Sequence, residues 1–191
     1  MIENFREYNK LRELLEANSS AVVAFGRMNP PSVGHLEMMK DLVKLAKQKG
    51  CEAYLYLSHT SDAKKNPLSY DDKIKFVKKY APQGLNVVKS EVRNFIDVCK
   101  EIVKLGGKNI TFVCGEDRKA EYERILTKYI DEIGADNVEV YSGSRTEGIS
   151  GSKLRAMAVN GDLDGFKKVS IAKDKDAETI YHLVRKGLKV E

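Results

Sequence analysis

Short apolar runs recur along the chain and alternate with amphipathic segments. Five such runs cover residues 21–25, 53–57, 85–88, 110–114 and 138–141. Their apolar character is largely continuous, which is typical of parallel strands that are buried on both faces of a sheet. We therefore expect these five runs to form the strands of a parallel sheet.

The segments between the runs have helical spacing. Leu36, Met39, Val43 and Ala46 share one helical face after the first run. The next two segments keep this spacing, and residues 118–133 predict a fourth, more polar helix. Strands that alternate with helices form right-handed βαβ units. The pattern predicts an α/β fold, a Rossmann-like, doubly wound, five-stranded parallel sheet in the order 3-2-1-4-5.

Two further helices are expected at the ends of the chain. Residues 3–17 carry an apolar stripe before the first strand, and residues 175–186 carry another after the core. Gly187 is expected just past the end of the last helix, where glycine is favoured. The 191 residues suit one domain over 1–191, with its core over 20–170.

Composition narrows the class of protein. Hydrophobic residues make up 42% and charged residues 32%, as in a soluble globular chain. The net charge of +5 fits a protein that handles anions, but it is too small to indicate nucleic-acid binding. No apolar run reaches the ~18 residues of a membrane span. The N-terminus is too polar for a signal peptide, and the three cysteines lack metal spacing. We expect a cytoplasmic protein and leave a homo-oligomer open.

The stretch "AVVAFGRMNPPSVGHLEMMK" carries the strongest chemical signal. It follows the first strand, and ligands of open parallel sheets bind beyond the carboxyl ends of the strands. Gly26 allows close approach of a ligand, and Ser32 can cap a helix that begins near Gly34. The free N–H groups of that first turn attract phosphate, with His35 and Arg27 as further donors. A rigid turn with a surface histidine is the alternative.

Two stretches resemble a known family. "GRMNPPSVGH" resembles the G-R-F-x-P-x-H-x-G-H signature of the HIGH-superfamily nucleotidyltransferases. Within that superfamily it is closest to the archaeal-type nicotinamide-nucleotide adenylyltransferases and related phage-encoded proteins. "ISGSKLR", at residues 149–155, resembles the family motif I-S-[SG]-T-x-x-R, which opens a late helix. The resemblance covers roughly residues 20–170.

The resemblance implies a reaction and a set of residues. The family transfers AMP from ATP to a phosphate-bearing acceptor and releases pyrophosphate, without a covalent enzyme intermediate. His35, Arg27 and Arg155 would be the catalytic residues, with Arg155 reaching the leaving pyrophosphate. Mg²⁺ would bridge the phosphates with few protein ligands. The phosphate-binding set implied on the two loops is Gly26, Ser32, Gly34, Ser150, Gly151 and Ser152, with Ser150 or Ser152 as the cap of the late helix.

Acceptor contacts are assigned by weaker similarity. "CGEDR" resembles the family's G-x-D element, which would place Gly115 and Asp117 near the acceptor or a ribose. Equally, the acids there can simply begin a helix. "KKNPLSYDDK" resembles a family stretch that would bring Asn66 to the acceptor, and His59 would line the same site. Ser32 stands where the family has Thr or His, and the chain has no Trp to stack on a pyridine ring.

Alternatives therefore stay open for both the acceptor and the activity. Nicotinamide mononucleotide, which would give NAD, fits the two motifs best. The same fold could instead act on phosphopantetheine or flavin mononucleotide, or transfer a cytidylyl group from CTP. A non-catalytic nucleotide-binding regulatory domain is a further alternative. If the protein is phage-encoded, we expect it in the cytoplasm of the host. A class I aminoacyl-tRNA synthetase is excluded because 191 residues leave no room for a tRNA-binding domain.

Overall fold

The computed structural model describes residues 4–143 and 150–190. A five-stranded sheet has the order β3-β2-β1-β4-β5, and every neighbouring pair is parallel. Its strands are β1 Ser20–Gly26, β2 Glu52–Leu57, β3 Leu85–Val88, β4 Asn109–Cys114 and β5 Asn137–Ser142. The predicted fold class and strand order are confirmed, because continuous apolar runs did mark the strands.

The chain divides into two compact units. The sheet unit comprises Met1–Gly26, Met39–Ser58 and Pro82–Ser144, and the helical unit comprises Arg27–Met38, His59–Ala81 and Arg145–Glu191. Helix α2, Val33–Gln48, begins in the helical unit and continues in the sheet unit. A single domain over the whole chain stays a prediction.

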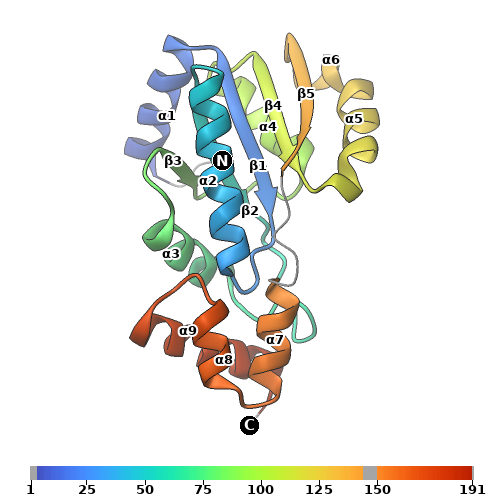
Figure 1. Ribbon diagram of the computed structural model, residues 1–191. Helices are drawn as coiled ribbons and strands as arrows, with labels where there is room; N and C mark the ends of the chain where they lie inside the picture. Colours follow the sequence, from blue (N-terminus) through green and yellow to red (C-terminus); the bar gives the residue numbers. More distant parts are fainter. Residues whose placement is uncertain (1–3, 144–149, 191) are drawn as a thin grey trace. The chain divides into compact units, whose positions relative to one another are not determined.

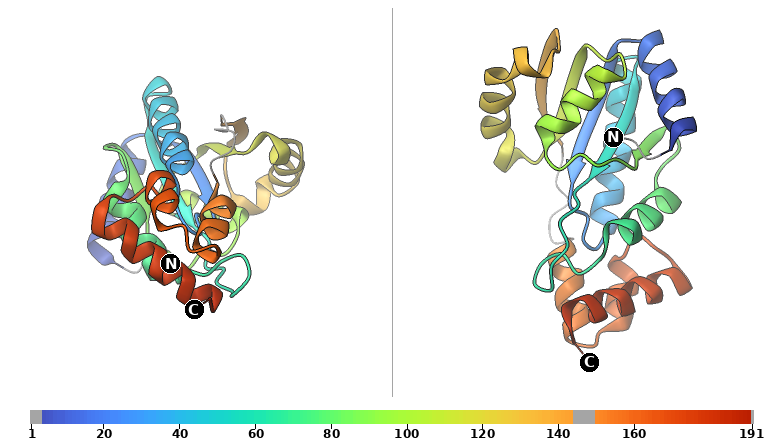
Figure 2. Two further views of the ribbon diagram at one scale, coloured as in Figure 1. Left: turned by 60° about the horizontal axis from the view of Figure 1, so that its bottom comes forward. Right: turned by 180° about the vertical axis from the view of Figure 1, so that it is seen from behind.

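Helices cover both faces of the sheet unit (Figures 1 and 2). One face packs against α1 Phe5–Ala17, α4 Phe95–Lys104, α5 Lys119–Lys128 and α6 Ile130–Ile133, in a core that includes Tyr54 and Phe112. The other face is covered by α2, whose Met39, Leu42 and Val43 are buried. The doubly wound arrangement follows from strands that are apolar on both sides.

Local signals fix where these helices begin and end. The side chain of Asn4 accepts from two backbone N–H groups at the start of α1, and Asn94 does the same for α4. Gly106 and Gly134 follow helix ends with φ of 105° and 77°, as expected for glycines at such ends. The predicted helix over 118–133 is wrong in detail: it is a 3₁₀ turn, η1 Glu116–Arg118, followed by α5 and α6 with a break at Tyr129.

The helical unit contains α3 Tyr70–Tyr80, α7 Gly151–Val159, α8 Leu163–Val169 and α9 Asp174–Leu188. Phe166 of α8 meets Tyr181 of α9 edge to face, with ring centroids 5.3 Å apart. Tyr80 donates from its hydroxyl to Asp176 at 2.7 Å, which ties α3 to α9. Helix α8 was not anticipated from the sequence. None of the helices in the described part of the chain is long and apolar enough to cross a membrane.

The expected position of Gly187 is wrong. The last helix runs to Leu188, so Gly187 lies inside it, and Lys189 takes the left-handed conformation at its end with φ of 57°. A Cβ atom on Gly187 would lie 2.1 Å from the main-chain oxygen of Pro67. Glycine is therefore present for close packing against the 59–69 segment rather than to end the helix.

Candidate functional site

The first motif forms a tightly held loop in the helical unit. Arg27 is exposed, whereas Met28 and Asn29 are buried. Met28 has a φ of 41°, a left-handed conformation that non-glycine residues keep only where their surroundings hold it. The Asn29–Pro30 peptide bond is cis. The loop therefore has an uncommon backbone conformation at Met28.

Ser32 and His35 form a reciprocal contact at the start of α2. The main-chain oxygen of Ser32 accepts from the N–H groups of His35 and Leu36, which places Ser32 at the N-cap position. Its own N–H donates to Nδ1 of His35 at 3.0 Å, and its hydroxyl lies 2.9 Å from the same atom. The expected hydroxyl cap is replaced by this ring contact, which resembles a capping box with histidine in the usual place of glutamate.

This contact determines the tautomer of His35. Since Nδ1 accepts a hydrogen bond, the neutral ring carries its proton on Nε2. Burial lowers the pKa of His35 from 6.5 to about 4, so the ring is neutral at pH 7. The arrangement presents a neutral N–H donor whose orientation is fixed by the backbone of its own helix.

The second motif opens α7 against the same loop. Ser150 is the N-cap, and its hydroxyl accepts from the N–H of Lys153 at 3.4 Å, as one of the two expected caps. A Cβ atom on Gly151 would lie 3.1 Å from the main-chain oxygen of Pro30. Glycine at this position therefore allows the first turn of α7 to lie against the loop of the first motif.

Arg155 joins the two motifs directly. Its Nη1 donates to the main-chain oxygen of Asn29 at 2.7 Å, and its Nη2 donates to the hydroxyl of Ser152 at 2.8 Å. Burial lowers the pKa of Arg155, the positive charge of Arg27 lowers it further, and Asp62 acts in the opposite direction. The fold therefore holds two guanidinium groups close enough to repel each other, which an anion bound beside them would relieve.

The segment before α3 is folded on itself. Asp62 and Asn66 pair through their backbones, and the Asp62 carboxylate accepts from the N–H groups of Lys64 and Lys65 at 2.8 and 2.7 Å. The amide of Asn66 also donates to this carboxylate, and these hydrogen bonds hold the pKa of Asp62 well below its usual range. Asn66 is buried in this turn, and its contact with an acceptor stays a prediction.

The predicted site residues fall into two groups. The helical unit contains Arg27, Ser32, Gly34, His35, His59, Asn66, Ser150, Gly151, Ser152 and Arg155. Among them, His59 stacks on Tyr70 with ring centroids 3.7 Å apart. The sheet unit contains Gly26, Gly115 and Asp117. Gly26 ends β1 and Gly115 precedes η1, in which Asp117 is exposed, so the plain role of an acid that begins a helix fits its position.

Sequence reasoning missed three residues of the helical unit. Asn29 was overlooked although it stands inside the first motif, directly before two prolines. Asp62, which forms the turn with Asn66, was also overlooked. Lys73 is fully buried, and its Nζ donates to the main-chain oxygen of Thr60 at 3.3 Å. The sequence did contain a signal for this burial: the spacing of Lys73 to Val77 and Tyr80 places it on the apolar face of α3.

The expected Mg²⁺ would need oxygen ligands, which Asp and Glu side chains supply. Within residues 4–143 and 150–190, no group of three or more His, Cys, Asp or Glu side chains could hold a metal ion. The Asp62 carboxylate already accepts three hydrogen bonds. The expected Mg²⁺ stays a prediction.

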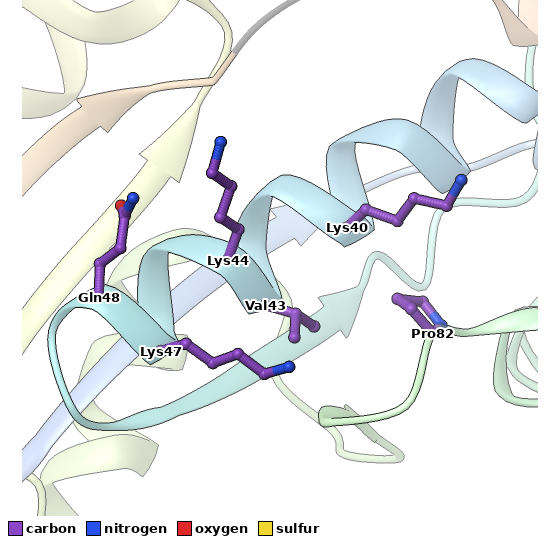
Figure 3. A pocket seen from close by; sticks show the side chains of 6 residues that line it. All are labelled: Lys40, Val43, Lys44, Lys47, Gln48 and Pro82. Carbon is purple, nitrogen blue, oxygen red and sulfur yellow. The ribbon is translucent and has the colours of Figure 1, made fainter.

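The sheet unit has a separate cavity of about 510 Å³ on the surface of α2 (Figure 3). Its lining consists of Lys40, Val43, Lys44, Lys47, Gln48 and Pro82. Three lysines and no carboxylate line it, so the cavity is basic. None of the predicted site residues is among the lining residues.

Comparison with known proteins assigns the family. The model of the cytidylyltransferase-like family matches residues 23–157, which include both motifs. The chain belongs to this family. Membership in the cytidylyltransferase-like family agrees with the expected HIGH-type nucleotidyltransferase class and supports nucleotidyltransferase activity in general. No curated protein matches the chain.

Two solved structures resemble this member of the cytidylyltransferase-like family. One is Thermotoga maritima TmcAL bound with alpha-thio ATP, at 8% identity and a TM-score of 0.52, over 89% of this chain and 56% of that one. The other is a macrolide-efflux protein from Streptococcus pneumoniae, at 18% identity and a TM-score of 0.48, over 80% of this chain and 55% of that one. The chain spans little more than half the length of these proteins, and TmcAL supports the fold alone.

Proposed function

We propose that this protein transfers the AMP group of ATP to nicotinamide mononucleotide, or to its acid form, and releases pyrophosphate. An oxygen of the acceptor phosphate forms a bond to the α-phosphorus. The bond from that phosphorus to the α–β bridging oxygen breaks, and its electron pair leaves with pyrophosphate. The observation that carries the proposal is the 2.7 Å hydrogen bond from Arg155 to Asn29, which unites the two motifs beside Arg27.

The proposed roles follow from the donors. A guanidinium has five N–H groups, and Arg155 uses two of them on Asn29 and Ser152 in the described part of the chain. The remaining three suit the oxygens of the leaving pyrophosphate, which gains charge in the transition state. His35 donates from Nε2 to an α- or β-phosphate oxygen. The capped first turn of α7 offers backbone N–H groups to the β- and γ-phosphates.

Catalysis in this scheme is positioning and charge stabilisation. No side chain acts as a nucleophile. The triphosphate brings Mg²⁺ with it, which neutralises phosphate charge when bound. The chain's own contribution is to orient the phosphates with Arg27, His35 and Arg155.

The choice of nicotinamide mononucleotide as the acceptor rests on the first motif. The first motif of this chain has Arg27 where the pattern of phosphopantetheine enzymes has Thr, so its loop is more cationic and suits two phosphate-bearing nucleotides. The missing Trp means that another aromatic side chain would have to contact a pyridine ring. Because the matched family is described as cytidylyltransferase-like, CTP-dependent cytidylyl transfer is the second candidate.

A substrate panel tests the proposal. The purified chain is given ATP or CTP with Mg²⁺ and one acceptor at a time: nicotinamide mononucleotide, its acid form, phosphopantetheine or flavin mononucleotide. Pyrophosphate release is measured and the product is identified by mass. We expect release only with ATP and a pyridine nucleotide. Arg155→Ala should abolish it, whereas Lys153→Ala, an exposed change in the same turn, should not.

Each other outcome has a distinct meaning. Turnover only with phosphopantetheine or flavin mononucleotide contradicts the acceptor and keeps the transferase class. Turnover only with CTP favours the second candidate. Specific nucleotide binding without turnover on any pair of substrates, under conditions where the chain is folded, would replace the transferase with a regulatory nucleotide-binding role.

A further inference from the structure

Asn29 is held by an unusually complete set of hydrogen bonds for a loop residue. Its side chain is buried, with 4% of the residue exposed. The amide oxygen accepts from the N–H of Leu68 at 2.8 Å, and the amide nitrogen donates to the main-chain oxygen of Leu68 at 3.0 Å. The pair of opposed bonds fixes the orientation of the amide, because the flipped amide would bring donor against donor and acceptor against acceptor.

The backbone of Asn29 faces a different partner. Its main-chain oxygen accepts from Nη1 of Arg155. The main-chain oxygens of Asn29 and Pro30 also lie against Gly151, with 3.3 and 3.1 Å to the position that a Cβ atom would take. One residue therefore connects the segment that contains Leu68 with the first turn and a half of α7.

The neighbouring backbone explains why the side chain matters for the main-chain oxygen. Met28 has a positive φ, which is costly for a residue with a Cβ atom and persists only when the surroundings enforce it. The side-chain pair with Leu68 supplies such a restraint one residue away. Loss of this pair would remove a contact that holds the loop in which Met28 and the main-chain oxygen of Asn29 lie.

We infer that Asn29 is a positioning residue for the proposed transfer, which orients the guanidinium of Arg155 toward the leaving pyrophosphate through the Asn29–Leu68 pair. The inference rests on the proposed function. It assigns Asn29 no contact with substrate, since its side chain is buried and its polar atoms are bonded to Leu68. A purely structural role would instead lower stability without acting through Arg155.

A double-mutant cycle on binding separates these roles. The probe is inorganic pyrophosphate, titrated calorimetrically into the wild-type chain, Asn29→Ala, Arg155→Ala and the double variant. We expect Asn29→Ala to weaken binding about tenfold in the wild-type background and less than about twofold in the Arg155→Ala background. An equal loss in both backgrounds, or no pyrophosphate binding by the wild-type chain, would overturn the inference.

A matched control lies in the sheet unit. Asn86 donates from its side-chain amide to the main-chain oxygen of Ala53 and to the carboxylate of Glu52, both at 3.2 Å, so Asn86→Ala removes amide hydrogen bonds that involve neither motif. Its pyrophosphate affinity should equal that of the wild type. A tenfold loss there too would mean that any lost amide bond weakens binding, which contradicts a specific role for Asn29.

Asn29→Asp covers the case in which Asn29→Ala fails to fold. The aspartate still accepts from the Leu68 N–H, and its protonated form can donate to the Leu68 oxygen as the amide does. A carboxyl buried against a carbonyl has a raised pKa, so the donor returns on acidification. Pyrophosphate affinity relative to the wild type at the same pH should therefore recover between pH 7.5 and 5.5. A ratio that does not change with pH would count against the inference.

The test does not depend on turnover. If no acceptor supports pyrophosphate release but the cycle shows coupling, the proposed function fails and the link between Asn29 and Arg155 remains. If turnover is as proposed and the cycle is additive, the inference alone fails.

Discussion

The Nδ1 atom of His35 lies 3.0 Å from the backbone nitrogen of Ser32, three residues earlier in the chain. The helix therefore uses one ring nitrogen of His35 for its own N-terminus and leaves the other as a donor. A histidine restrained in this way would lose little further freedom on binding a phosphate in the proposed role. Its place at the start of α2 also adds the positive end of the helix dipole.

Replacing His35 should affect activity much more than folding. His35→Ala removes one preorganised donor to a phosphate, which typically costs about 10²–10³-fold in rate. It also removes a cap contact worth about 1 kcal/mol of stability. Steady-state turnover and urea unfolding of the same preparations measure both effects. His182→Ala, at an exposed histidine of α9, is the control and should change neither. Turnover close to wild type in His35→Ala would show that His35 is only a cap residue.

Stability should fall on acidification because of His35. Burial lowers its folded-state pKa to about 4 from 6.5, so between these values the unfolded chain binds more protons than the folded chain. Stability from this group is complete above pH 6.5 and is lost as the pH falls toward 4. Urea unfolding at pH 7 and pH 4.5 measures the loss. His35→Gln should show a smaller loss, and an equal loss in both proteins would contradict the shifted pKa.

Lys73 should make the free energy of unfolding depend on pH in the alkaline range. Burial lowers its pKa from 10.5 to about 8, so between these values the unfolded chain again binds more protons. The stability contributed by Lys73 should therefore rise as the pH increases from 8 to 10.5. Lys73→Met removes the titrating group and should flatten this rise in urea unfolding. Lys78→Met, an exposed lysine of the same helix, should keep it. A rise of the same size in Lys73→Met would assign it to another group.

Gly187→Ala should destabilise the chain, against the usual trend. Glycine to alanine inside a helix normally stabilises by about 0.5–1 kcal/mol. Here the new Cβ atom would lie 2.1 Å from the main-chain oxygen of Pro67, so backbone must move, at a typical cost of about 1–3 kcal/mol. Thermal unfolding compares it with Lys186→Ala, an exposed neighbour that should change little. Stabilisation by Gly187→Ala would mean that α9 and Pro67 are not in this contact.

Strands β1, β2 and β4 were predictable because each is buried on both faces, so its apolar residues are consecutive. Runs such as residues 53–57 and 110–114 carry this signal without any alignment. Helix ends depended on contacts far away in the sequence and were less predictable. Gly187 looked like a helix end by its residue type, and only the approach of Pro67 explains why it lies inside α9.

The sequence indicated candidate site residues but not the contacts among them. Arg27, His35 and Arg155 stand in two motifs and have residue types that suit phosphate binding, and their catalytic roles stay predictions. The contacts of Asn29 could not be predicted, because its partner Leu68 is 39 positions away. Leu68 takes part through its backbone, so the residue type at this position gives no sign of the contact. The ring contact of Ser32 was missed for a related reason, since a serine before a helix ordinarily caps with its hydroxyl.

Gly187 packs on Pro67, which is next to Leu68, the hydrogen-bond partner of Asn29. The last helix therefore contacts the same segment as Asn29 does. An affinity tag fused after α9 would therefore be attached to a helix that packs against the segment paired with Asn29, and Asn29 accepts from Arg155. If Arg155 binds the triphosphate as proposed, a fusion at this end would alter nucleotide affinity without changing either motif. For kinetic work, a tag is better placed before α1, whose buried Leu11 and Leu15 pack in the core of the sheet unit.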